Sequence, residues 1–215
     1  MNTNVAAPGA APILAALLAA TLSAAGCAGQ QSVRTDTTEA RTATASATAS
    51  ASTNGTGAML APMTPAERDA LLGDIHDPAI VRAVERIRAA TAAFRSLDRA
   101  VEAGYSGTVP NCLENPPAGG MGYHHANAEL MDSTIELERP EILVYERTAS
   151  RDYELTGVEY IVPISAWNRS APPEAMGQKL KRSNALGIWY LHVWVWRPNS
   201  NGLFADWNPA ITCRS

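Results

Sequence analysis

Three segments in the last third of the chain have the pattern of β-strands. They span residues 142–147, 153–162 and 186–196, and all three are rich in Val, Ile, Leu and aromatic residues. The last one carries apolar or aromatic residues at most of its even and odd positions, so both of its faces would be covered. A strand of this kind usually lies in the centre of a sheet. The pattern therefore predicts a sheet that contains these three segments.

The segments before the strands have the pattern of helices. The sequence Thr-Pro-Ala-Glu at 64–67 provides an N-cap, a proline at the first helical position and a capping-box partner, which predict a short helix ending near Leu72. A longer helix is predicted over 77–104, because apolar residues recur there at three- and four-residue steps and a glycine ends the run. We interpret its arginines as a solvated face: Arg82, Arg86, Arg88, Arg95 and Arg99.

The connecting region is dominated by glycine and proline. Residues 105–122 are predicted to form a loop. The run Gly-Gly-Met-Gly-Tyr-His-His at 119–125 is interpreted as a tethered loop that presents histidines, and a short helix is expected within 126–137. Because helices come first and strands later, we predict an α+β fold, with N-terminal helices packed on a mainly antiparallel sheet in a single domain over 62–215.

The first 26 residues have the features of an export signal. An apolar run over residues 13–22 is too short for a lasting membrane-spanning helix, and small residues lead to Cys27. The sequence Ala24-Ala25-Gly26-Cys27 resembles the lipobox of a bacterial lipoprotein. That resemblance implies lipidation of Cys27 and an exported protein, anchored through the lipid to a membrane of the cell envelope, the outer membrane in a two-membrane cell. The alternative is an ordinary cleaved signal peptide in which Cys27 has no role.

Residues 27–61 consist mainly of Ala, Thr, Ser, Gln and Gly. Such a segment has no large apolar groups to offset the entropy of ordering, so we expect a disordered tether between the anchor and the domain.

Charge and cysteine content narrow the possible functions. The chain has 17 basic and 21 acidic residues, a net charge of -4, which gives no sign of the basic patch that nucleic-acid binding requires. Of the three cysteines, Cys27 is assigned to the lipid, which leaves Cys112 and Cys213. In an oxidising compartment these two are predicted to form a disulfide, and their use as free metal-binding thiols is disfavoured because exported thiols oxidise.

Three polar residues stand out as candidate metal ligands. His192 lies in the strongest predicted strand, and Glu159 is a charged residue within an apolar strand. A polar side chain buried in either strand needs a hydrogen-bond or charge partner. If the two strands are neighbours and the glycine-rich segment brings His124 over them, two imidazoles and a carboxylate could bind a divalent transition metal such as zinc, copper or iron. Tyr123 and Asn127 are expected to lie next to these ligands and hold them in position without contacting the metal.

Other interpretations of the histidines remain open. His125 and Glu129 would form a competing i, i+4 pair if their stretch were helical, and Met121 would add a soft ligand that favours copper. Adjacent histidines point in opposite directions in an extended chain, so at most one of His124 and His125 should face the site. The same residues could instead form a structural polar network or a metal-free catalytic His/Glu pair.

Several further motifs carry a resemblance to a known group of proteins. They are Gly-Met-Gly-Tyr-His at 120–124, Arg-Pro-Glu-Ile-Leu-Val-Tyr at 139–145, Val-Glu-Tyr-Ile-Val-Pro at 158–163, His-Val-Trp at 192–194 and Phe-Ala-Asp-Trp-Asn-Pro at 204–209. Together they resemble a family of uncharacterised secreted bacterial proteins and lipoproteins. The resemblance implies export and a single domain, and it brings no activity with it.

The sequence thus favours an exported binding protein with a transition metal as its first candidate ligand, while its small-molecule or protein partner is not defined. One alternative is an enzyme that uses the metal, or the His/Glu pair, in the same pocket. Another is an envelope protein that meets a macromolecule through Trp189, Trp194 or Trp207. Convergent buried histidines would favour the first two, and dispersed histidines with exposed tryptophans the third.

Overall fold

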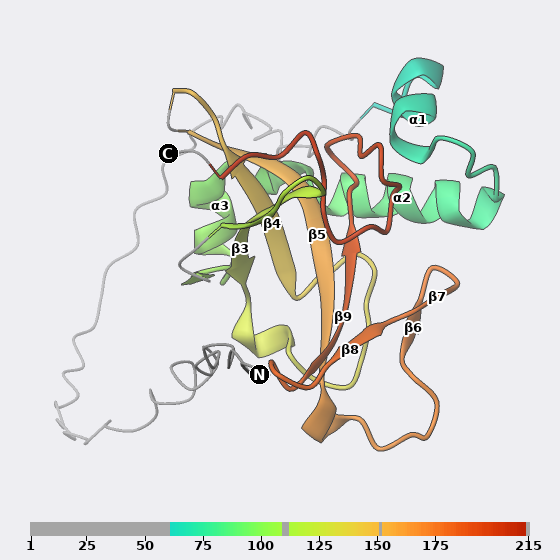
Figure 1. The fold of residues 1–215 in the computed structure, drawn as a ribbon, viewed down its shortest axis with the longest axis vertical. Coiled ribbons are helices and arrows are strands. Elements are labelled where there is room, and N and C mark those ends of the chain that lie inside the picture. Colours follow the sequence, from blue (N-terminus) through green and yellow to red (C-terminus); the bar gives the residue numbers. More distant parts are fainter. Residues whose placement is uncertain (1–60, 109–111, 151, 214–215) are drawn as a thin grey trace, which may run out of the picture. The chain divides into compact units, whose positions relative to one another are not determined.

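The computed structural model describes residues 61–108, 112–150 and 152–213, which belong to one compact unit. The predicted signal peptide, Cys27 and nearly all of the predicted tether lie outside these residues. Helices occupy the first part of the described chain and antiparallel strands the rest, which confirms the predicted α+β fold (Figure 1). No helix in the described ranges has both the length and the apolar character needed to cross a membrane.

The helical part begins where the capping signal predicted. Helix α1 spans Pro65–Leu72, and the side chains of Thr64 and Glu67 complete the capping box. Helix α2 spans Pro78–Thr91 and starts at the N-cap Asp77.

The single long helix expected up to Gly104 is wrong. The 3-10 turn η2 covers Ala92–Arg95, the backbone of Ser96 is extended, and helix α3 spans Leu97–Glu102. The three- and four-residue spacing of apolar residues is compatible with such a break, because a helix can bend around the sheet while its apolar side chains still face inward.

The main sheet has seven strands. They are β1 (Gly107–Thr108), β2 (Leu113–Asn115), β3 (Gly119–Ala126), β4 (Ile142–Arg147), β5 (Tyr153–Pro163), β8 (Lys181–Ser183) and β9 (Ile188–Val193). Their order is β1-β3-β4-β5-β9-β8, with β2 also paired to β3, and every pair is antiparallel. Between β5 and β8 lie the turn η4 (Ile164–Ala166) and the hairpin of β6 (Glu174–Ala175) and β7 (Gln178–Lys179).

The sequence predicted the central strands better than the glycine-rich region. Strand β4 has the predicted bounds, and β5 differs from its predicted range by one residue at its end. The third predicted strand stops at Val193, because the backbone of Trp194 leaves the ladder and donates a hydrogen bond to Leu203. The predicted histidine-presenting loop is instead strand β3, and the short helix expected after it is the 3-10 turn η3 (Ala128–Leu130).

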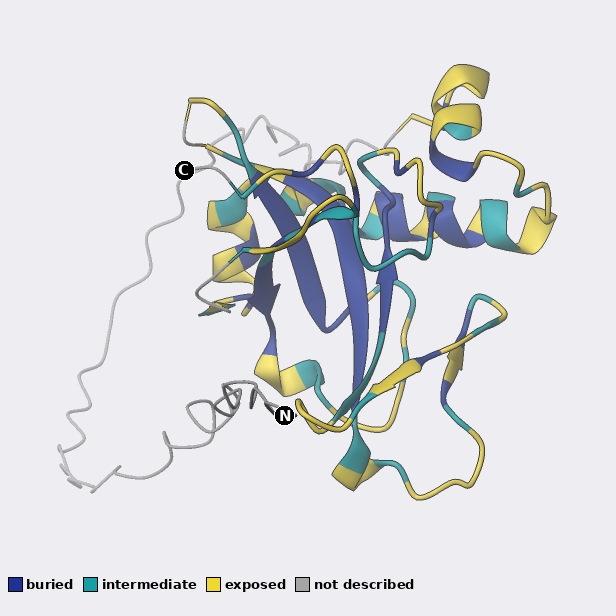
Figure 2. Ribbon diagram, viewed as in Figure 1, coloured by how far each residue is buried: buried dark blue, intermediate teal, exposed yellow. Residues whose placement is uncertain are grey.

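Side chains on the two faces of the sheet form separate clusters. The larger one packs against the helices and includes Val84, Ile87, Leu143, Tyr160 and Leu191. The smaller one lies on the other face and includes a residue of the C-terminal segment. Its members are Ala126, Ile142, Val144, Ile161, Trp194 and Ile211. Figure 2 shows β4 and β5 buried along most of their length. The centre of the sheet is therefore shielded from water on both sides.

One helical arginine departs from the predicted solvated face. Arg88 is only 8% exposed, and its guanidinium donates to the carbonyl of Val195 at 2.8 Å. The helical spacing explains this position, since Arg88 follows Val84 by four residues and precedes Thr91 by three, and both of those are buried.

The structure contains the disulfide that the cysteine content predicts. Cys112 and Cys213 form a disulfide between residues 101 positions apart. It joins the segment just before β2 to the C-terminal segment that runs along β3, where the backbones of Gly120 and Asn208 are hydrogen-bonded in both directions.

Candidate metal centre

The predicted ligands come from three strands of the sheet. Glu159 on β5 lies directly opposite His192 on β9, so the expectation that these strands are neighbours is confirmed. His124 lies on β3, which is separated from β5 by β4. All three side chains leave the sheet on the face of the smaller cluster, where Trp194 and Ile161 are also found.

His124 can reach across β4 because the residues that pair with it on β4 and β5 have a short side chain or none. Its partner on β4 is Val144, and the partner of Val144 on β5 is Gly157, which has no side chain. A Cβ atom at Gly157 would lie 2.8 Å from the carbonyl oxygen of Val193 and 3.4 Å from the Cα of Trp194. The glycine therefore permits the close approach of the chain that carries His192 and Trp194, and adds no bulk under the imidazoles.

The three polar groups converge on one point. The Nε2 atoms of His124 and His192 are 3.1 Å apart, and the carboxylate oxygens of Glu159 lie 3.6 Å and 3.5 Å from them, respectively. One ligand atom from each residue falls within 4.8 Å of the others, as required for binding a single ion. His124 and Glu159 are each 6% exposed and His192 is 1% exposed.

Burial sets the charge state of this cluster without an ion. It raises the pKa of Glu159 to about 8, with further contributions from Asp206 and Glu141. Burial lowers the pKa of His124 to about 4 and that of His192 well below its ordinary value. The carboxylate of Glu159 is too far from either imidazole for a normal hydrogen bond, so the hydrogen bond within the cluster is the one between the two Nε2 atoms, and burial dominates the pKa of all three groups.

The backbone also orients one of the imidazoles. His124 faces the cluster through Nε2, and the backbone of Gly122 forms a hydrogen bond with the same imidazole, which favours its protonated form. A histidine that donates from one nitrogen to a carbonyl presents the lone pair of the other, which is the usual arrangement of a metal ligand.

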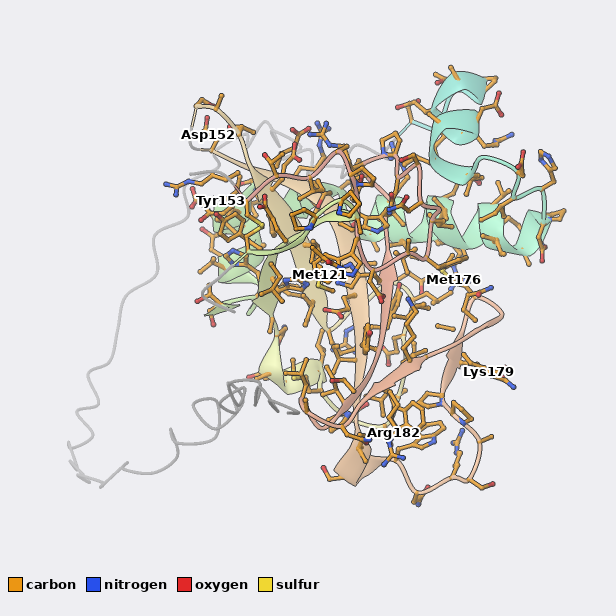
Figure 3. All side chains as sticks on the ribbon, in the orientation of Figure 1. Met121, Asp152, Tyr153, Met176, Lys179 and Arg182 are labelled. Carbon is orange, nitrogen blue, oxygen red and sulfur yellow. A yellow bond between two sulfur atoms is a disulfide. The ribbon has the colours of Figure 1, made fainter. Side chains whose placement is uncertain are left out.

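His125 is placed away from the cluster. As expected for adjacent residues in a strand, it leaves the opposite face, where it packs edge-on against Tyr145 and Tyr153, although it too is buried. The stretch is a strand, so the helical pairing of His125 with Glu129 does not occur. Met121 lies half-buried on the same strand (Figure 3), and its role as a soft ligand stays a prediction.

Tyr123 and Asn127, which were expected to lie next to the ligands, contact other parts of the structure. Tyr123 packs edge-on against Tyr153, which is labelled in Figure 3. The side chain of Asn127 donates to the carbonyl of Ala103 and accepts from the backbone of Glu129, and so connects α3 to η3. The position of Tyr123 follows from alternation in β3, because it is adjacent to His124, whereas Asn127 lies just beyond the end of the strand and caps η3.

An arginine would be another possible partner for the buried carboxylate of Glu159, but the two arginines at or beyond the ends of the neighbouring strands make other contacts. Arg197 pairs with Glu146, while Arg147 lies over the ring of Tyr153. The fourth histidine of the chain, His76, is exposed.

A second buried carboxyl group, Glu141, was not identified from the sequence. It is 1% exposed, accepts a hydrogen bond from the backbone of Ile161 at 3.0 Å, and has its pKa raised to about 8, first by burial. In the sequence, Glu141 stands between Pro140 and an apolar strand. A solvated residue at the end of a strand would show the same pattern, so the sequence does not reveal its burial.

The fold and the cluster together define a single α+β domain with a buried His/Glu/His group that could hold a metal ion. Comparisons with protein-family models, with curated proteins and with solved structures give no match.

Proposed function

We propose that this protein binds one divalent transition metal through His124, Glu159 and His192. The supporting observation is the convergence of two imidazole nitrogens and a carboxylate inside an apolar cluster. Each group is costly to bury alone, and a shared cation would satisfy all three at once. Two nitrogens and one oxygen suit zinc, iron or copper better than magnesium or calcium, which prefer oxygen ligands.

The surroundings favour binding over catalysis. The three ligands are almost fully buried, which leaves little room for a substrate to reach an ion held between them. The proposed role is therefore tight retention of an ion that stabilises the sheet. The partner-binding alternative is less well supported, because the histidines converge and Trp194 is 1% exposed, with its indole donating to Ala205.

Metal content of variants tests this proposal. The purified full chain should contain close to one equivalent of zinc, iron or copper by elemental analysis, and Glu159→Gln and His192→Gln should each lose it. His125→Gln is the matched control, because His125 is also buried but lies on the other face. Equal metal content in parent, Glu159→Gln and His192→Gln would overturn the proposal, as would its absence from a parent reconstituted with each ion.

We also infer that the protein is exported and held at a membrane through lipid on Cys27. The apolar run before Cys27 and the small residues next to it support this inference. The disulfide between Cys112 and Cys213 adds weaker support, since such bonds persist mainly in oxidising compartments.

A further inference from the structure

A second candidate site lies beside the helices, away from the His/Glu/His cluster. A cavity of about 240 Å³ is bounded by α1, α2, η2, the start of β5 and the segment that follows β9. Its size is below the roughly 300–1,000 Å³ typical of sites for drug-sized ligands, so it suits a small molecule.

One wall of this cavity is a fixed aromatic ring. The indole nitrogen of Trp196 donates to the hydroxyl of Thr91 at 3.0 Å. The guanidinium carbons of Arg88 and Arg95 lie 4.3 and 5.5 Å from the centre of the indole ring. Two cations are therefore held next to one aromatic surface at the cavity.

Arg88 is buried without a full set of hydrogen-bond partners. Its guanidinium donates to the carbonyl of Val195, and Glu67 lies 3.7 Å away. Its Nε is buried and has no hydrogen-bond partner among the residues that the structure describes. Buried polar groups are normally satisfied, so Arg88 is an incompletely satisfied cation beside the cavity, and the parts of its guanidinium that line the cavity are available to an acceptor.

The remaining charges at the cavity are one cation and one anion. Since Glu67 already neighbours Arg88, Arg95 and Glu154 are left, and within the described ranges neither of them forms an ion pair shorter than 4.0 Å. Apolar surface from Leu71 and Leu155 completes the lining. The site therefore offers a positive group, a negative group and an apolar wall to a single ligand.

We propose that this cavity binds a small amino carboxylate: a free amino acid or a short peptide with its charged ends. The carboxylate pairs with Arg95 and the free donors of Arg88, the ammonium group pairs with Glu154, and the side chain packs against Trp196. Arginine suits planar carboxylate recognition. The two glutamates at the cavity disfavour a doubly charged phosphate.

Calorimetry on the purified full chain tests the proposal with matched probes. Leucine and the dipeptide Leu-Leu carry both charges, 4-methylpentanoate lacks the amine, and 3-methylbutylamine lacks the carboxylate. We expect saturable binding of leucine or Leu-Leu, with each single-charge analogue at least about tenfold weaker. The comparison of leucine with Leu-Leu separates a free amino acid from a peptide as the source.

Variants localise the binding. Arg95→Gln and Glu154→Gln should each weaken the zwitterion about tenfold or more, while Arg99→Gln, which changes an exposed arginine on α3, should leave it unchanged. Circular dichroism melting of each variant confirms that it folds. No saturable binding of either zwitterion, equal binding of 4-methylpentanoate, or binding that Arg95→Gln does not weaken would each overturn the proposal.

Discussion

Glu141 is a buried carboxyl group whose protonation should control stability. Its pKa is about 8 in the folded protein, against 4.5 for the ordinary side chain, so the folded state holds a proton between these values that the unfolded state has lost. Stability from this group is therefore fully present below about pH 4.5 and is lost as the pH rises through about 8.

Replacement of this carboxyl by an amide should remove that dependence. Glu141→Gln should match the parent near pH 4.5 and exceed its free energy of unfolding by on the order of 2–4 kcal/mol at pH 8.5. Urea unfolding from pH 4.5 to 8.5 in the presence of a chelator measures this, because no bound ion then adds to the stability of either protein. The gain includes the removal of the repulsion that Glu141 exerts on Glu159. Parallel curves with no gain at high pH would show that the carboxyl is not buried as described.

Single polar residues were informative in the sequence only where they interrupted an apolar pattern. Glu159 and His192 stood out in this way, and strand pairing then placed them side by side. Arg88 was assigned to the solvated face because arginine is usually exposed, although its helical spacing places it between two buried residues. Glu141 was missed because it lies just before β4, where sequence alone does not distinguish a buried from a solvated position. Burial of both residues depends on contacts from distant segments, such as the carbonyl of Val195 for Arg88.

At the level of elements, β3 depends on a glycine in the left-handed region. Gly122 has φ +87°, and a Cβ atom there would lie 2.6 Å from the carbonyl oxygen of Tyr145. Its backbone also holds the imidazole of His124. This one residue therefore links the path of the strand to the position of a proposed ligand.

Gly122→Ala should destabilise the protein by on the order of 2–4 kcal/mol and reduce metal retention, because the strand must shift away from β4. Gly187→Ala is the control, since Gly187 has φ +70° but nothing within 4 Å of its would-be Cβ, so only about 1 kcal/mol of backbone strain is expected. Chemical denaturation with metal analysis measures both. Equal losses in the two variants would contradict the close contact at Gly122.

Local pattern predicted elements where hydrophobic spacing was regular, as in α1, β4 and β5. The local pattern failed for β3, because its glycines predict a loop. Backbone pairing with Tyr145 and Val144 of β4 makes this stretch a strand. The local pattern also joined α2 to α3, because the break at Ser96 depends on packing against the sheet and leaves no proline or glycine as a signal. Long-range pairing, which no local window contains, accounts for both differences.

At the scale of the whole molecule, the disulfide ties the C-terminal segment over the smaller cluster. The Cys112→Ser, Cys213→Ser double variant should lose on the order of 4–5 kcal/mol of unfolding free energy, since the bond closes a loop of about 100 residues. Denaturant unfolding measures the loss. In the parent, alkylation without reductant followed by mass spectrometry should leave both thiols unmodified, and full alkylation of both would contradict the pairing.

Membrane attachment is a separate prediction for the whole chain. Cys27→Ser should move the protein from the membrane fraction to the soluble fraction of expressing cells, because the lipid supplies the anchor. Immunoblotting of fractionated cells measures the distribution. Ser23→Ala, which leaves Cys27 in place, is the control, and membrane association that survives Cys27→Ser would refute the anchor.

The most direct measurement for the central claim is anomalous X-ray diffraction from crystals of the metal-loaded protein, with data on both sides of the absorption edge of the ion. The account predicts one strong peak at about 2.0–2.2 Å from the Nε2 atoms of His124 and His192 and from a carboxylate oxygen of Glu159. A peak bound by other residues, or none between these three in a protein that carries a full equivalent of metal, would contradict it.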